Sequence, residues 1–188
     1  MKLVPRNIRR FPQHIRRFIQ RNRKECNFFI IFISIFIAAH SLYYFSSPLK
    51  VPLTLQNTNT RISSTIINLI TPKEETYAED TAIISGGYSM SVAWGCEGIE
   101  GIFMLIAALV AYSMKRKWKI YGILAGTALL FFLNIFRLIF LFYTFKYKPS
   151  LFDIMHVYVG QTFIIFFAVL FFVVWVNAFS KREPPGAV

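Results

Sequence analysis

Three residues in the second half of the chain, Cys96, Arg137 and His156, carry side chains that together could perform acyl transfer. A cysteine thiol becomes a strong nucleophile when a nearby histidine takes its proton or a nearby cation lowers its pKa. A fixed guanidinium beside the attacked carbonyl can stabilise the oxyanion that forms there. At membrane depth such an interaction is less screened than in water. The three residue types therefore predict a cysteine acyl-transfer site if the fold brings them together.

Four polar residues near this trio have spacings that suit a supporting role. Side chains three or four residues apart lie on the same face of a helix. Asp153 is three residues before His156 and could therefore orient the imidazole. The other three supporting candidates are Glu97, which follows Cys96 directly, Glu100, four residues after Cys96, and Asn134, three residues before Arg137. The Glu97 carboxylate would tend to raise the pKa of the neighbouring thiol.

Each member of the trio also has an ordinary structural explanation. A single cysteine in an apolar helix commonly serves as a small packing residue. His156 could be an interfacial side chain bonded to water, and Arg137 could form an ion pair with Glu97 or Glu100. The residues alone leave these alternatives open.

The composition indicates the environment in which these residues lie. Of the 188 residues 55% are hydrophobic and only 16% are charged, and the charges are crowded into a few short stretches. A soluble domain carries about a quarter charged residues, so a soluble globular enzyme is excluded. Two cysteines, Cys26 and Cys96, are too few for a secreted fold held by disulfides.

Four apolar segments predict four transmembrane helices. A crossing helix needs roughly 20 mostly apolar residues. Residues 28–45, 120–145 and 154–180 form long runs with at most one formal charge each. The run at residues 101–114 has only 14 residues, so it spans only if its helix extends back to about Val92.

The positions of lysine and arginine predict the orientation of these helices, since positive residues favour the cytoplasmic side. Nine of the 21 lie in residues 1–27, four in residues 115–119 and two after Ser180, all on one side if there are four crossings. Both termini are therefore expected in the cytoplasm. Topology and anionic lipid head groups also explain the net charge of +12, so no nucleic-acid partner is expected.

The depth of each residue follows from its distance along its helix. At a rise of 1.5 Å per residue, Arg137 lies about 26 Å, Cys96 about 27 Å and His156 about 30 Å from the cytoplasmic end. These heights agree within the few residues of slack at helix ends. The spacing therefore predicts that three helices bring the thiol, the guanidinium and the imidazole to one level near the extracytoplasmic face of the cell (inner) membrane.

These inferences describe an all-α integral membrane protein. Residues 5–24 suit either a helix on the inner leaflet or a disordered basic arm. Apolar residues at helical spacing between Thr60 and Pro72 predict a short amphipathic helix on the extracytoplasmic side. The expected segments are a basic cytoplasmic segment (1–27), a first transmembrane helix (28–46), an extracytoplasmic loop with the amphipathic helix (47–91), a three-helix catalytic transmembrane core (92–180) and a cytoplasmic tail (181–188).

Three stretches resemble, in order, the motifs of the exosortase/archaeosortase family. The resemblance covers about residues 85–180, and the compact size and third motif are similar to the exosortase H type. The stretches are residues 92–101 (VAWGCEGIEG) for the cysteine motif, residues 134–138 (NIFRL) for the arginine motif and residues 153–161 (DIMHVYVGQ) for the histidine motif, which ends in Gln161.

This resemblance implies a membrane cysteine transpeptidase or peptidase that needs no cofactor and no metal ion. Its partners would be exported proteins with a C-terminal sorting signal, made of a short motif, a transmembrane helix and a basic cluster. The enzyme would pass them to a lipid, a glycan or water. By the same resemblance Cys96 is the nucleophile that forms a thioester, Arg137 stabilises charge and His156 transfers the proton. Relatives often have Ser, Thr or Asn where this chain has Glu97, which leaves the activation of the thiol open.

Other classes of membrane protein fit parts of the sequence. A thiol oxidoreductase needs a cysteine pair, but Cys26 and Cys96 are predicted on opposite sides of the membrane. A small transporter or a non-catalytic assembly protein could use Arg137 with Glu97 or Glu100 as a buried ion pair. Such a protein would give Cys96 no role and would tolerate its replacement by alanine.

Overall fold

The structure is a computed structural model, and it describes residues 21–92 and 95–180. The expected surface segment at residues 5–24 therefore lies mostly outside the described residues, and the tail at 181–188 lies wholly outside them. In chain order the elements are α2 (Arg23–Phe45), η1 (Ser47–Leu49), α3 (Val51–Ile70), η2 (Pro72–Glu74), β1 (Tyr77–Glu79), β2 (Ala82–Ser85), β3 (Tyr88–Ser91), α4 (Ile99–Ala111), α5 (Arg116–Tyr147), η3 (Pro149–Leu151), η4 (Ile154–Val159) and α6 (Gly160–Ser180).

Three helical segments of the described chain are long and apolar enough to cross a membrane: α2, α5, and η4 continued by α6. Helix α4 has only 13 residues, so it is about 20 Å long against a hydrocarbon core of about 30 Å. The expectation that this helix extends back to about Val92 is wrong. Gly95 and Gly98 have φ angles of 85° and 76°, a left-handed conformation that an α-helix cannot contain. Residues 95–98 therefore form a loop.

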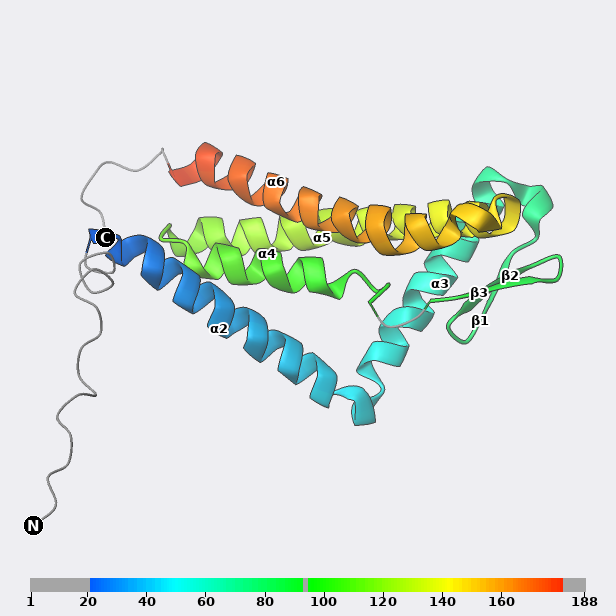
Figure 1. Cartoon of the computed structure of the whole chain (residues 1–188), viewed down its shortest axis with the longest axis horizontal. Coiled ribbons are helices and arrows are strands. Elements are labelled where there is room, and N and C mark those ends of the chain that lie inside the picture. The colour runs from blue at the N-terminus through cyan, green and yellow to red at the C-terminus, as the bar shows by residue number, and fades with distance from the viewer. Residues whose placement is uncertain (1–20, 93–94, 181–188) are drawn as a thin grey trace, which may run out of the picture.

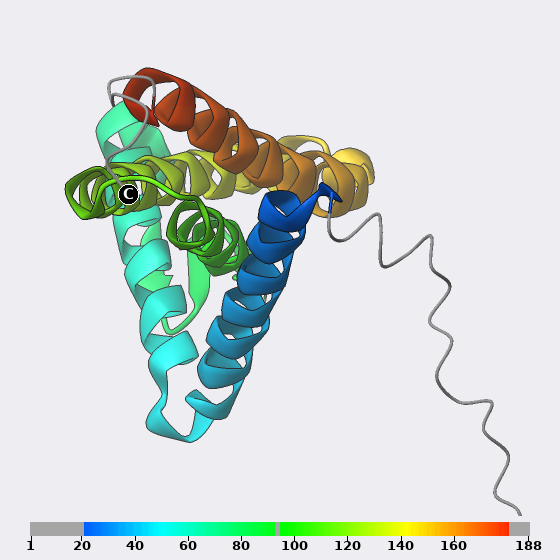
Figure 2. The same ribbon diagram turned by 90° about the vertical axis from the view of Figure 1, so that its left-hand side faces the viewer.

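The apolar helices pack side by side in alternating directions. Figure 1 shows the starts of α2 and α5 and the ends of α4 and α6 at one end of the molecule. Figure 2 shows α4 in the middle, where it packs against α2, α5 and α6. Leu105, Leu130 and Ala168 form part of the buried core between these helices. A side chain at Gly126 would collide with Leu105 and Phe171, so this glycine permits the close approach of α5 to its neighbours.

The opposite end of the molecule carries a small antiparallel sheet of order β1-β2-β3 (Figure 1). The described chain is therefore mostly helical. It is not all-α, which was the expectation, because it also contains this sheet. Gly86 and Gly87 connect β2 to β3 with φ angles of 52° and 85°, which a two-residue hairpin turn requires. The sheet, α3 and the end of α5 share one buried apolar cluster that contains Ile67, Ile83 and Phe142.

Helix α3 contains the amphipathic segment predicted between Thr60 and Pro72, but it is 20 residues long. Its orientation differs from that of an ordinary amphipathic helix, because its polar face is buried and its last residues, Leu69 and Ile70, are exposed. The polar face is buried because most of its side chains form hydrogen bonds with the loop before α4 and with residues 76–80. The buried polar residues are Gln56, Asn59, Thr60, Ser63 and Ser64.

Candidate active site

Cys96 lies in the loop between β3 and α4, not within a helix. The loop is held from α5, because the Asn134 side-chain amide donates a hydrogen bond to the Cys96 carbonyl oxygen at 3.1 Å. Asn134 can lie this close because the next turn of the loop contains Gly98. A Cβ atom at Gly98 would stand 2.6 Å from Cγ of Asn134. Because Cys96 precedes α4, the expectation that it shares a helix face with Glu100 is wrong.

The Cys96 thiol faces the imidazole of His156. Sγ and Nε2 are 2.6 Å apart, and the thiol is 4% exposed. His156 lies on η4, a π-helical segment at the start of the third candidate span. Its ring stacks on that of Phe152, with centroids 5.5 Å apart and planes 7° from parallel. The stacking fixes the ring plane, so the imidazole is held where it can exchange a proton with the thiol.

Arg137 completes the group from α5 and is only 5% exposed. Its Nη2 donates a hydrogen bond to the backbone carbonyl oxygen of His156 at 3.4 Å, and its guanidinium also interacts with Cys96. A side chain at Gly160 would collide with Nε of Arg137, so this glycine makes room for the guanidinium. Within the described ranges Nε has no hydrogen-bond partner. The structure thus brings a thiol, an imidazole and a guanidinium together from three elements.

The two carboxylates that follow Cys96 in the chain have hydrogen-bond partners other than Arg137. The Glu97 carboxylate accepts hydrogen bonds from the Gly95 backbone N–H and from Nε2 of Gln56, each at 2.7 Å. The Glu100 carboxylate accepts a hydrogen bond from Nε2 of Gln161, also at 2.7 Å. In the part of the chain that the structure describes, neither forms a salt bridge with Arg137. The direct ion pair considered for a transporter or an assembly protein is therefore absent from the described residues, although both carboxylates interact with Arg137 at longer range.

Asp153 interacts with His156 only through its charge at longer range and does not hydrogen-bond its imidazole. Asp153 is exposed, and among the described residues no hydrogen bond joins the two side chains. The residue that contacts the ring is Phe152, one position earlier. The π-helical turn of η4 changes which residues share a face, and spacing based on an ordinary helix does not detect this change.

Helix α3 contributes to this site, and the sequence alone did not predict that contribution. Gln56 binds the Glu97 side chain, and Nδ2 of Asn59 donates a hydrogen bond to the Glu97 carbonyl oxygen at 3.3 Å. Both side chains are nearly fully buried. The available signal was the polar stripe on α3, whose residues recur at three- and four-residue spacing. A buried polar stripe needs polar partners, and here the partner is the cysteine loop.

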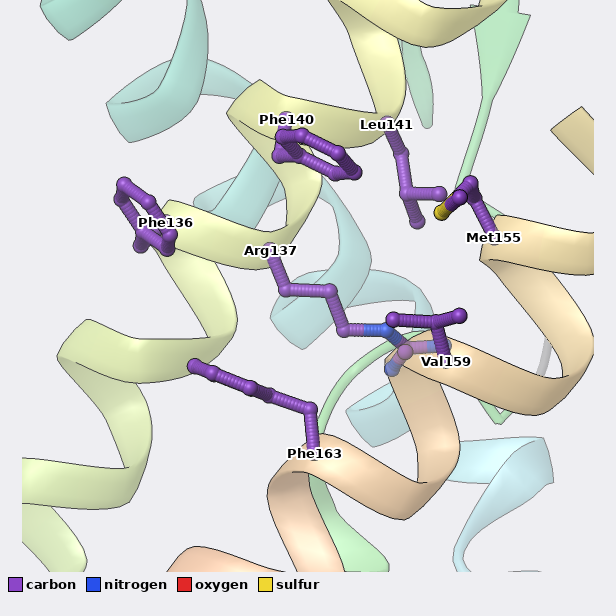
Figure 3. A pocket seen from close by; sticks show the side chains of 8 residues that line it. Phe136, Arg137, Phe140, Leu141, Met155, Val159 and Phe163 are labelled. Atoms are coloured by element: carbon purple, nitrogen blue, oxygen red, sulfur yellow. The ribbon is translucent and has the colours of Figure 1, made fainter. Parts of the chain in front are cut away.

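A cavity of about 230 Å³ lies next to this group, between α5 and the start of α6 (Figure 3). Its surface is apolar, including the part that belongs to Arg137, whose side chain extends across it from α5. No cluster of three or more His, Cys, Asp or Glu residues that could hold a metal ion occurs in residues 21–92 and 95–180.

Comparison with known proteins agrees with the membrane character of the fold. A family model described as transmembrane exosortase matches residues 25–175, a range that includes Cys96, Arg137 and His156. Searches of curated proteins and of solved structures returned no match. Because the family model covers most of the chain, and the described helices include three that can span a membrane, this protein belongs to the transmembrane exosortase family.

Proposed function

We propose that this protein is a membrane-embedded cysteine transpeptidase or peptidase whose nucleophile is Cys96. The observation that supports this role most directly is the 2.6 Å separation between Sγ of Cys96 and Nε2 of His156. Membership of the exosortase family supports a membrane transpeptidase role. The proposed substrates are exported proteins that end in a sorting signal of a short motif, a transmembrane helix and a basic cluster.

The proposed first half-reaction forms a thioester. Nε2 of His156 accepts the thiol proton, and the sulfur of Cys96 attacks the carbonyl carbon of the scissile peptide bond. The oxyanion that develops is stabilised by the Arg137 guanidinium, which is fixed before the reaction by its contact with the His156 carbonyl oxygen. The carbon–nitrogen bond then breaks, and the imidazolium gives its proton to the leaving amine.

The proposed second half-reaction releases the substrate from the enzyme. A hydroxyl or amine of a lipid or glycan acceptor, or a water molecule, attacks the thioester carbonyl. His156 takes the proton of this nucleophile and returns it to the sulfur as the carbon–sulfur bond breaks. Protons therefore balance over the two steps without a cofactor.

Alanine substitution of each cysteine tests this function. Cys96→Ala is expected to remain in the membrane at normal levels while an exported reporter with a C-terminal sorting signal accumulates uncleaved. Cys96→Ser is expected to be nearly as inactive, because a hydroxyl needs stronger base assistance than a thiol. Cys26→Ala is the matched control, since Cys26 lies near the start of α2, far along the chain from the site, and should cleave normally. Cleavage at the wild-type rate by Cys96→Ala would exclude the peptidase function.

A second measurement does not depend on the substrate. The rate at which iodoacetamide alkylates Cys96 reports how readily the thiol loses its proton. His156→Ala is expected to slow this alkylation, with Cys26→Ala as the background so that only Cys96 reacts. An unchanged rate would show that the imidazole does not activate the thiol.

A further inference from the structure

The cavity beside Arg137 has the chemistry of an apolar binding site. Its walls come from α5, η4 and the first turn of α6 (Figure 3). All of these elements belong to segments that can span a membrane. The apolar side chains that line it are Phe136, Phe140, Leu141, Met155, Val159 and Phe163.

The cavity opens on the outer surface of the helices. Leu141 is almost fully buried, whereas Phe136, Phe140 and Val159 are 61%, 47% and 45% exposed. Apolar side chains exposed on membrane-spanning helices face lipid. A ligand can therefore reach the cavity sideways from the hydrocarbon region.

Arg137 joins this cavity to the thiol. Its guanidinium interacts with Cys96, and the same side chain crosses the cavity in Figure 3. Its Nε is buried, and within residues 21–92 and 95–180 no acceptor bonds to it. A buried donor without an acceptor is costly, so a ligand that brings an oxygen to Nε gains from that contact.

We propose that this cavity is the subsite for an apolar side chain in the membrane-embedded segment of the substrate, next to the bond that Cys96 attacks. A backbone carbonyl oxygen of that segment accepts the hydrogen bond from Nε of Arg137. A peptide supplies both the apolar group and the acceptor, whereas a lipid acyl chain at this depth supplies only the apolar group. This inference rests on the proposed function.

The chain offers a matched pair of substitutions to test the subsite. Val159→Trp places a large side chain at the rim of the cavity and reduces its volume. Val173→Trp makes the same change further along α6, at a position that is 46% exposed against 45% for Val159 and does not line the cavity. Phe163→Ala enlarges the cavity and serves as the second variant.

The experiment measures kcat/KM in membranes for reporters that carry Ala, Leu or Trp at each position beside the cleaved bond. One missing methylene in an apolar pocket costs roughly tenfold or more in kcat/KM. At one reporter position, wild type and Val173→Trp should therefore prefer Leu over Ala by at least about tenfold. Val159→Trp should lose or reverse that preference, and Phe163→Ala should shift it toward Trp.

The two proposals fail in different ways. If neither Val159→Trp nor Phe163→Ala changes side-chain preference at any position, the subsite is wrong even when Cys96→Ala is inactive. Equal effects of Val159→Trp and Val173→Trp would also overturn the subsite, because only one of these residues lines the cavity. Cleavage by Cys96→Ala would overturn the proposed function instead. Alkylation of Cys96 by iodoacetamide should proceed at the wild-type rate in Val159→Trp and Phe163→Ala, since the thiol and imidazole are unchanged.

Discussion

The Arg137 side chain makes three contacts that the ammonium group of a lysine could not make at the same time. Nη2 binds the His156 carbonyl oxygen, the guanidinium interacts with Cys96, and the side chain lines the cavity. A planar guanidinium holds several donors in fixed directions, whereas lysine presents one flexible point charge. Any role for Arg137 beyond its charge should therefore be lost on substitution by lysine.

Arg137→Lys is accordingly expected to be inserted stably but to cleave substrate about 100-fold more slowly, the cost of one well-placed oxyanion donor. The measurement is reporter cleavage over time in membranes with matched enzyme levels. Lysine at this position would be sufficient if Arg137 only neutralised a carboxylate. A wild-type rate for Arg137→Lys would therefore reduce this residue to a structural cation.

The hydrogen bonds of Glu97 give this residue a structural role that the sequence alone does not indicate. From the sequence its carboxylate is simply a negative charge beside the thiol. In the structure that carboxylate accepts hydrogen bonds from Gly95 and Gln56, and it fastens the cysteine loop to α3. These partners lie 2 and 41 residues away, and only the nearer one is accessible to reasoning from local sequence.

At the scale of elements, η2, β2 and α5 are joined through a polar cluster around the buried Glu74. The Glu74 carboxylate accepts hydrogen bonds from the Lys146 ammonium and the Tyr147 hydroxyl at the end of α5. Lys146 also donates to Oγ of Ser85 on β2 at 3.0 Å, and that hydroxyl donates to the Glu74 carbonyl oxygen at 2.5 Å. This cluster holds η2, which follows α3 in the chain, and the sheet against α5. It thereby supports the helix whose Gln56 binds the cysteine loop.

Acid is expected to weaken this cluster. The hydrogen bond from Lys146, followed by that from Tyr147, holds the pKa of Glu74 below its ordinary value of 4.5. A carboxyl group with a lowered folded-state pKa contributes stability above its unfolded pKa and loses it as the pH falls through the folded pKa. The free energy of unfolding should thus be steady near neutral pH and should fall once the pH drops below 4.5.

The melting temperature in detergent, measured across that pH range, checks this prediction for wild type and Glu74→Gln. The variant should melt at a lower temperature at neutral pH, because Lys146 loses its carboxylate partner. The difference between the two proteins should shrink in acid. Glu75→Gln, at an exposed neighbouring position, is the control and should behave as wild type. A difference that stays constant with pH would contradict the role of the Glu74 charge.

At the scale of elements, the sequence predicts the long apolar helices but not the start of α4 or the buried polar face of α3. Helices α2, α5 and α6 are recognisable because hydropathy over 18 or more residues does not depend on partners. The start of α4 is not, since Gly98 has a left-handed φ and its missing Cβ leaves room for Asn134, a residue distant in the chain. The inward polar face of α3 was missed for the same reason. Its apolar residues show a helical period, but the partners of Gln56 and Asn59 come from the cysteine loop.

For the molecule as a whole, α4 is shorter than the hydrocarbon core is thick. The loop that precedes α4 would therefore also lie at membrane depth. Non-helical backbone at membrane depth is tolerated only where it is buried in protein or lines a water-filled cavity. Cys96, Glu97 and Gly98 are all buried, and hydrogen bonds from α3 and α5 hold the loop. The loop can therefore lie within the bundle and continue the path of α4 toward the end that carries the sheet.

The orientation of the molecule follows from charge and can be measured on the full chain. Figure 1 places the start of α5, with Arg116 and Lys117, at the end opposite the sheet. Positive residues favour the cytoplasm, so the sheet and Cys96 are expected outside it. Glu79→Cys on β1 and Lys117→Cys at the start of α5 are both exposed positions for labelling once the two native cysteines are replaced by alanine.

In intact cells, a membrane-impermeant maleimide should label Glu79→Cys, and it should label Lys117→Cys only after lysis. The parent protein without cysteines is the control for background. An exported substrate meets the thiol only if Cys96 opens on the same side as Glu79. The opposite labelling pattern would place the sheet end in the cytoplasm, and a site at that end could not act on exported proteins whatever its chemistry.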